Sequence, residues 1–154
     1  MVCHIRPATS SDATAISRVV LAALRESNSK DYPPGVIAQV EQSFSPEAIT
    51  LHLAKRKVFV ALLGETIIGT AALDGDVVRS VFVEPAHQKS GIGRQLMEVV
   101  HATAALAGTE TVRVPSSITA EKFYTALGYR KIRDVYQGFE RTLVMEKRLE
   151  GSPT

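Results

Sequence analysis

The stretch Val81-Phe82-Val83-Glu84-Pro85-Ala86-His87-Gln88-Lys89-Ser90-Gly91-Ile92-Gly93-Arg94 decides how this chain is interpreted. Its alternating apolar residues predict a strand that stops at Pro85. A polar turn follows, and Gly91 and Gly93 then open a long amphipathic helix that ends near Gly108. The sequence therefore predicts a buried strand that passes through a glycine-containing turn into a helix.

Such a turn has the properties of a phosphate site. The first four N–H groups of a helix lack partners within it and carry the positive end of the helix dipole. Glycine lets an anion approach the main chain closely, and Lys89 and Arg94 would add charge-assisted contacts. A P-loop is excluded because no Lys-Ser or Lys-Thr pair follows these glycines. A dinucleotide fingerprint is excluded because Leu96 stands where a third glycine is needed.

The pattern Q-x-x-G-x-G, formed by Gln88 to Gly93 after a strand and Pro85, resembles the pyrophosphate motif of the GNAT (Gcn5-related N-acetyltransferase) family. The resemblance implies that acetyl-coenzyme A binds where the fourth strand splays from its neighbour. The Val81 N–H would face the thioester carbonyl and stabilise its developing negative charge. The expected cofactor-binding residues are Val81, Phe82, Val83, Gln88, Lys89, Ser90, Gly91, Ile92, Gly93, Arg94, Ser117, Phe123 and Tyr124.

A second landmark lies downstream, where residues 117–129 resemble the family pattern N-x-x-A-x-x-F-Y-x-x-x-G-F. Ser117 stands at the usual asparagine, and a shorter side chain has less reach for a hydrogen bond. Tyr129 replaces phenylalanine. The resemblance implies that Tyr124 acts as the acid that protonates the leaving thiolate of coenzyme A. The alternative is that Tyr124 is a core aromatic packed beside Phe123.

The residue that removes the proton from the amine is left open. Some family members use a glutamate as the base at the position of Val77. Valine cannot accept a proton, so the usual base is missing here. Asp76, Glu84 or a chain of waters remain as alternatives, although Asp76 also suits a turn and Glu84 a surface position.

The acceptor pocket is expected near the loop of residues 28–44, by resemblance to the family. Asp31 and Tyr32 would bind a cationic group through charge and ring face, or belong to an ordinary surface loop. Arg79 shares strand parity with Val81 and would then face the acceptor cleft, where it would pair with an acidic group; a solvated arginine is the alternative. The sequence does not identify the amine.

Residues 1–149 are expected to form a single GNAT domain, with a short flexible tail at 150–154. The fold class is α+β (the α/β three-layer type): a twisted mixed sheet of six to seven strands flanked by about four helices, the count coming from the resemblance. Strands are expected at 2–6, 57–63, 66–73, 77–83, 111–114, 129–136 and 139–148. Helices are expected after Ser10–Asp12, from Ser45-Pro46-Glu47, from Gly91 and over 119–127.

Composition narrows the function classes. The 154 residues are 45% hydrophobic and 22% charged, which favours a folded domain. With 18 basic and 16 acidic side chains, a net charge of +2 speaks against nucleic-acid binding. No run reaches the roughly 20 apolar residues that span a membrane. The single cysteine and the absence of a signal-like start favour a cytoplasmic protein, and the histidine spacing predicts no metal site.

These observations predict an N-acetyltransferase that uses acetyl-coenzyme A and a small-molecule or peptide amine in a ternary complex, without metal. A homodimer is possible by analogy with the family. The alternatives are a non-catalytic acyl-coenzyme A sensor and an acyltransferase that uses a longer acyl chain.

Overall fold

A mixed sheet of seven strands forms the centre of the described chain, in the order β1-β2-β3-β4-β5-β7-β6. The computed structural model describes residues 3–28, 34–138 and 140–149. Neighbouring strands are antiparallel except β4 and β5, which are parallel. The strands are β1 (His4–Pro7), β2 (Lys57–Leu63), β3 (Thr66–Asp74), β4 (Val77–Val83), β5 (Thr111–Ser116), β6 (Arg130–Gln137) and β7 (Glu140–Arg148).

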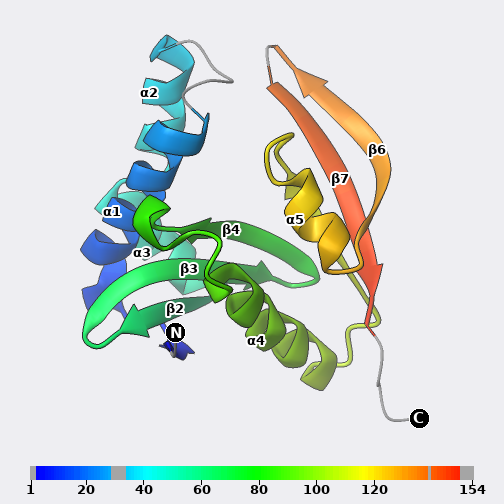
Figure 1. The fold of residues 1–154 in the computed structure, drawn as a ribbon, viewed down its shortest axis with the longest axis horizontal. Helices are drawn as coiled ribbons and strands as arrows, with labels where there is room; N and C mark the ends of the chain where they lie inside the picture. Colours follow the sequence, from blue (N-terminus) through cyan, green and yellow to red (C-terminus); the bar gives the residue numbers. More distant parts are fainter. Residues whose placement is uncertain (1–2, 29–33, 139, 150–154) are drawn as a thin grey trace.

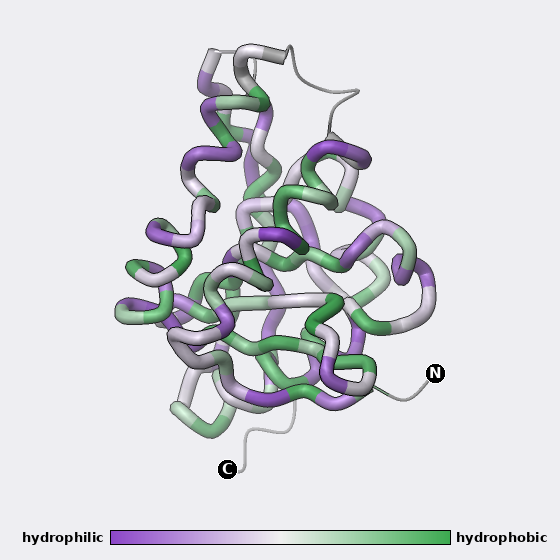
Figure 2. The backbone as a smooth tube through the Cα atoms, turned by 90° about the vertical axis from the view of Figure 1, so that its left-hand side faces the viewer, coloured by the Kyte–Doolittle hydropathy of each residue, from purple (hydrophilic) through white to green (hydrophobic). Residues whose placement is uncertain are grey.

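Helices cover both faces of this sheet (Figure 1). One apolar cluster joins α1 and α3 to one face, and the other joins α4 and α5 to the opposite face. Hydrophilic and hydrophobic residues alternate along the helical turns, as expected of helices that bury one side (Figure 2). The described helices are α1 (Ala13–Ala23), α2 (Pro34–Gln42), α3 (Pro46–Lys55), α4 (Ile92–Leu106) and α5 (Glu121–Ala126).

The predicted fold class is confirmed, with a correction in the first third of the chain. The expected helix at Ser45-Pro46-Glu47 is α3, and the Ser45 hydroxyl caps it by accepting a hydrogen bond from Ala48 N at 3.2 Å. Residues 34–42, expected as loop, form α2. Pro34 stands at its first position, where proline is tolerated, so the same rule that located α3 applied here too.

A β-bulge in β4 changes which side chains share a face. Ala72 pairs with Arg79 and Thr70 pairs with Phe82, so two residues of β4, Ser80 and Val81, lie opposite one residue of β3. Ser80 has φ 54°, a backbone conformation uncommon outside glycine. The predicted parity of Arg79 with Val81 is therefore wrong.

The side chains of β4 pack on both faces of the sheet. Arg79 shares its face with Phe82, which packs with the cluster under α1 and α3. Val81 and Val83 instead pack with the cluster under α4. The bulge thus lets one short segment send side chains to both layers.

Strands β4 and β5 touch only at one end. Val77 pairs with Arg113, and Arg113 N donates to Asp76 O at 2.9 Å. No further pair of these strands is in register in the described chain. The single pair at the start of β4 is consistent with the expected splay of the two strands (Figure 1 shows the fold).

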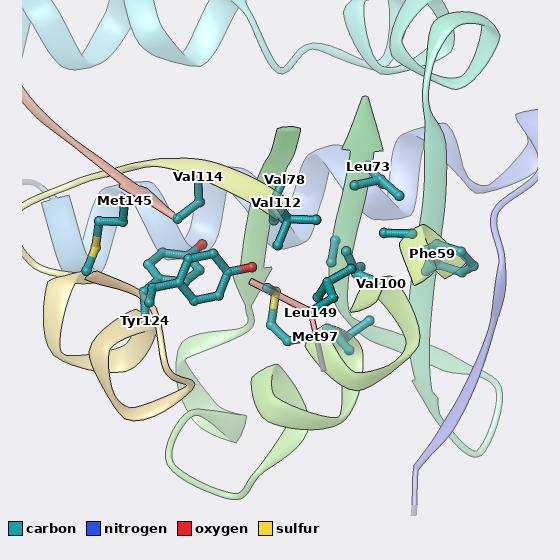
Figure 3. Close-up of a cluster of buried hydrophobic side chains, with 14 of the residues drawn as sticks. Phe59, Leu73, Val78, Met97, Val100, Val112, Val114, Tyr124, Met145 and Leu149 are labelled. Atoms are coloured by element: carbon teal, nitrogen blue, oxygen red, sulfur yellow. The ribbon is translucent and has the colours of Figure 1, made fainter. Parts of the chain in front are cut away.

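The larger core lies between α4, α5 and the sheet. Leu96, Met97 and Val100 of α4 are fully buried in it. Figure 3 shows Tyr124 among the same group of side chains, which also includes Val114 and Met145. This core holds α5 against the diverging strands, beside the turn that opens α4.

Candidate functional site

The turn between β4 and α4 is shaped by local hydrogen bonds. The Gln88 side chain donates from Nε2 to Val83 O at 3.1 Å, and Ser90 Oγ donates to His87 O. Lys89 has φ 64° and Gly91, the residue that caps α4, has φ 86°. Left-handed residues within a turn are typical of main-chain segments whose N–H groups bind anions.

Six consecutive main-chain N–H groups at this turn are free. Those of residues 89–94 donate no hydrogen bond to any described residue, whereas Gln95 N donates to Gly91 O at 3.0 Å. The first turn of a helix leaves such donors unsatisfied, with the dipole adding positive potential. The turn can therefore bind an anion with several phosphate oxygens.

A cavity of about 520 Å³ extends from this turn. We call it the amide cavity; its wall includes Val83, Gly91, Gly93 and Phe123. Of the remaining cofactor-binding residues predicted from sequence, Val81, Phe82, Gln88, Lys89, Arg94, Ser117 and Tyr124 also line it. The side chains of Ser90 and Ile92 do not, and Ile92 is buried in the core. The Ser90 side chain instead bonds His87 O within the turn.

A second cavity, of about 430 Å³, adjoins the first at β4. We call it the arginine cavity, because Arg56, Arg79 and Arg141 line it. Arg56 follows α3, Arg79 precedes the β4 bulge and Arg141 lies on β7. No aspartate or glutamate lines this cavity among the residues that the structure describes.

The two cavities meet at a shared wall. Val81 and Phe82 of β4, Ser117 and Ala120 before α5, and Tyr124 within α5 line both of them. Ser117 Oγ accepts a hydrogen bond from Ala120 N at 3.2 Å, which fixes this corner of the chain. A molecule held in one cavity can thus meet a molecule held in the other beside Tyr124 and Val81.

Tyr124 is both a core residue and a wall residue, so the two alternatives from the sequence are not exclusive. Its side chain is 5% exposed, and its ring meets those of Phe123 and Tyr129 edge to face at 5.1 and 5.4 Å. Its hydroxyl makes no hydrogen bond to a described residue, and no buried side-chain oxygen of the described chain lacks a partner. The hydroxyl therefore reaches the open space of the cavities. Burial raises the pKa of Tyr124, so the phenol stays protonated.

His52 lines the arginine cavity and was not identified from sequence. It lies on α3, half-buried, with its ring edge-on to Phe44 at 6.1 Å. Burial, followed by the charges of Arg56 and Lys55, lowers the pKa of His52, so the imidazole is neutral at pH 7. No described residue hydrogen-bonds to it, which leaves a ring nitrogen able to accept a proton from a molecule in the cavity.

The bases considered from sequence do not reach this space. Asp76 and Glu84 line neither cavity, and neither does Val77, which stands where some family members have a glutamate. Asp76 O accepts from Arg113 N, and Glu84 N donates to Ile68 O at 2.8 Å. The latter bond has a consequence for its neighbour: because N–H groups alternate along a strand, Val83 N–H turns away from β3 and toward the gap beside β5.

Of the three residues predicted from sequence to bind the acceptor, the structure describes one. Asp31 and Tyr32 lie outside the described residues, as do the first residue of the predicted opening strand and the tail at 150–154. Arg79 lines the arginine cavity, although on the opposite face of β4 from the one predicted. Arg56 and Arg141 were missed because nothing in the sequence indicates that α3 and β7 come together here.

Among residues 3–28, 34–138 and 140–149, no group of three or more His, Cys, Asp or Glu residues is placed to hold a metal ion. No helix in these ranges combines the length and the apolar character needed to cross a membrane.

Comparisons with known proteins give the same fold. A GCN5-related N-acetyltransferase from Rhodopseudomonas palustris has a TM-score of 0.87 and 22% identity, covering 97% of this chain and 99% of that one. The PaiA N-acetyltransferase from Thermoplasma acidophilum, in complex with coenzyme A, has a TM-score of 0.85 and 17% identity, covering 96% and 99%. The ribosomal-protein-S18-alanine N-acetyltransferase from Escherichia coli scores 0.72 at 15% identity, covering 99% of each chain.

Comparison of the sequence identifies a family but no individual curated relative. A search of the functionally curated proteins finds no match. The family model described as "Acetyltransferase (GNAT) domain" matches residues 28–149, most of the chain. That match includes the β4–α4 turn, the bulge and α5. The chain belongs to the GNAT acetyltransferase family.

Proposed function

We propose that this protein transfers the acetyl group of acetyl-coenzyme A to an amine held in the arginine cavity. The observation that carries the proposal is the shared wall: a cavity that begins at six free N–H groups meets a second cavity beside Tyr124 and Val81. Both substrates would be bound together, and the amine would attack the thioester directly.

The amide cavity fits the cofactor from end to end. The free N–H groups of residues 89–94 suit a pyrophosphate, and Lys89 and Arg94 add positive charge at the same mouth. Most of the cavity wall deeper in is apolar, including Val83 and Phe123, as an alkyl thioester arm requires. The PaiA relative with the same fold binds coenzyme A, which supports this assignment.

Two groups of the shared wall would act on the thioester. The Val81 N–H, next to the bulge, would donate to the carbonyl oxygen as it gains negative charge. Tyr124 would give its proton to the sulfur as the carbon–sulfur bond breaks and the new carbon–nitrogen bond forms. Burial raises the pKa of Tyr124, so the phenol is protonated before the reaction, and Tyr124 would regain the donated proton from solvent after each turnover.

His52 would take the proton that the amine loses. It is the side chain of the described cavity wall that can accept a proton at neutral pH, since the other ionisable groups there are three arginines and Tyr124. Its lowered pKa keeps it in the accepting form. Transfer directly or through one water would leave the acetylated amide neutral and His52 charged, until solvent removes the proton.

Calorimetry with coenzyme A and a thiol-release assay over a panel of amines test the proposal together. We expect coenzyme A to bind, and acetyl-coenzyme A to release thiol only when an acceptor is present. Binding without turnover of any amine would instead support an acyl-coenzyme A sensor. Faster turnover with longer acyl chains would replace acetyl transfer by acyl transfer.

A further inference from the structure

The arginine cavity has a one-sided charge. Arg56, Arg79 and Arg141 line it, and no aspartate or glutamate of the described ranges does. The protein as a whole is nearly neutral, with 18 basic and 16 acidic side chains. The positive charge of this cavity is therefore a local feature and not the result of an overall basic composition.

Within the described part of the chain, ion pairs neutralise Arg56 and Arg141 incompletely and none neutralises Arg79. Arg56 lies 3.8 Å from Asp74, a distance at the limit of an ion pair. Arg141 pairs with Asp134 at 3.1 Å, but Asp134 also binds Lys131 at 3.2 Å. Neither aspartate lines the cavity.

Arg79 makes no ion pair or hydrogen bond to any described residue. Its charge is close enough to Arg56 to contribute to lowering the pKa of that guanidinium, after burial, which is the larger cause. Two neighbouring cations that repel each other, with one of them unpaired, are stabilised when an anion binds between them.

The same charges act on the substrate. A diamine or polyamine would bring a second ammonium group beside three guanidinium groups, which is electrostatically unfavourable. A carboxylate or phosphate would accept paired hydrogen bonds from the planar guanidinium fork. Neutral His52 lines the same cavity, where it can take the amine proton.

We propose that the acceptor is an amine that also carries an anionic group, a carboxylate or a phosphate, bound by Arg79 with Arg56 and Arg141. This assignment rests on the proposed acetyl transfer and names its substrate class. It makes Arg79 a specificity-determining residue that acts through the acceptor and has no contact with the cofactor site, since Arg79 lines only the arginine cavity.

Matched acceptor pairs test the assignment. An α-amino acid is compared with its amide, an aminoalkyl phosphate with the corresponding amino alcohol, and a diamine serves as the cationic member. We expect the anionic member of each pair to have a kcat/KM at least about tenfold higher, the size of one charge-assisted contact. The carboxylate and phosphate arms show which anion the cavity accepts.

Arg79→Gln is the diagnostic variant. It is expected to lower kcat/KM for the anionic acceptors by about tenfold or more, and to leave the neutral amide within about twofold. Coenzyme A affinity should not change. Arg133→Gln is the matched control, because Arg133 is exposed on β6 and lines neither cavity.

The outcomes separate this inference from the proposed function. Equal use of the amide, the amino alcohol or the diamine by the unaltered protein would overturn the anionic acceptor alone, as would an Arg79→Gln variant that loses both members of a pair equally. No transfer to any amine, with coenzyme A still bound, would overturn the transferase proposal and this inference with it.

Discussion

The ring of Phe123 lies against the main chain of Gly93, so closely that a Cβ atom on the glycine would stand 3.1 Å from Cε1 and 3.2 Å from Cζ. Contacts this short require the neighbour to move. Gly93 was expected to be glycine so that a phosphate could approach. The structure adds a second reason, because Phe123 forms part of the amide cavity wall and needs the space that a missing Cβ leaves.

Gly93→Ala is therefore expected to push Phe123 and weaken coenzyme A binding by about tenfold, while the protein still folds. Isothermal titration calorimetry measures the affinity. Adding Phe123→Leu removes the ring that the new methyl group would meet, so the double variant should recover stability relative to Gly93→Ala. Equal coenzyme A affinity in a folded Gly93→Ala protein would remove this packing argument.

Gly91 is constrained by its backbone and not by space. It has φ 86°, and a Cβ atom at this position would have no neighbouring atom within 4 Å. Gly75 in the β3–β4 turn also has a positive φ, 62°, and equally open surroundings. Alanine at either position should cost about 1 kcal/mol of folding stability. Only Gly91→Ala should also weaken coenzyme A binding, because only that turn carries the free N–H groups. Matched losses of affinity in both variants would show that the turn has no special role.

Tyr124→Phe is expected to lower kcat by about a hundredfold, the range of general acid catalysis, and to leave the coenzyme A dissociation constant within about twofold. The control is Tyr129→Phe. Tyr129 packs on Tyr124, but its hydroxyl bonds His101 Nε2 at 2.7 Å and it lines neither cavity. A kcat that falls equally in both variants would indicate that the aromatic packing matters and that the Tyr124 proton does not.

Local signals in the sequence were sufficient to predict most of the fold. The bounds of β2 and β4 match the predicted ranges, because alternating apolar residues between clear turns specify a strand. Helix α2 was missed because Asp31-Tyr32-Pro33-Pro34-Gly35 dominated the interpretation of that segment, although a proline can begin a helix. The bulge at Ser80 was also missed, since no glycine marks it and strict alternation was assumed across it.

Part of the candidate site could likewise be predicted from local sequence signals and part could not. The residues that contact the amide cavity lie mostly in two short contiguous segments, so a motif could locate them. The arginine cavity draws His52 from α3, Arg56 from the residue after it, Arg79 from β4 and Arg141 from β7. These residues are brought together only by the order of the strands and the packing of α3, and a single sequence carries no local pattern for such an assembly.

His52→Gln tests the proton acceptor. Arg56 and Lys55, one helical turn further along the chain, act on the imidazole with their positive charges, and Arg79, Arg141 and Tyr124 line the same cavity. The pKa of His52 is lowered, so the neutral form persists to more acidic pH than usual and kcat/KM should fall only as pH drops below the ordinary value of 6.5. The variant is expected to lose about a hundredfold in kcat and to lose this acidic limb. His4 is exposed at the start of β1, so His4→Gln should keep the kcat of the unaltered protein and its acidic limb. An unchanged acidic limb in His52→Gln would assign proton removal to another group.

His101 provides a test of the core that is independent of catalysis. Burial, then the charge of Lys147, lowers the pKa of His101 to about 4 from 6.5. Between these two values the unfolded chain binds a proton that the folded protein does not, so folding stability should decrease as pH falls from 6.5 toward about 4 and the contribution should level off below it.

Urea unfolding at neutral pH and at about pH 5 measures this difference. His101→Gln keeps a side chain that can bond the Tyr129 hydroxyl but cannot be protonated, so its stability should depend less steeply on pH. The other histidines are present in both proteins and cancel in the comparison. Parallel stability profiles would mean that the pKa of His101 is not lowered in the folded protein and that water reaches its imidazole beside Tyr129.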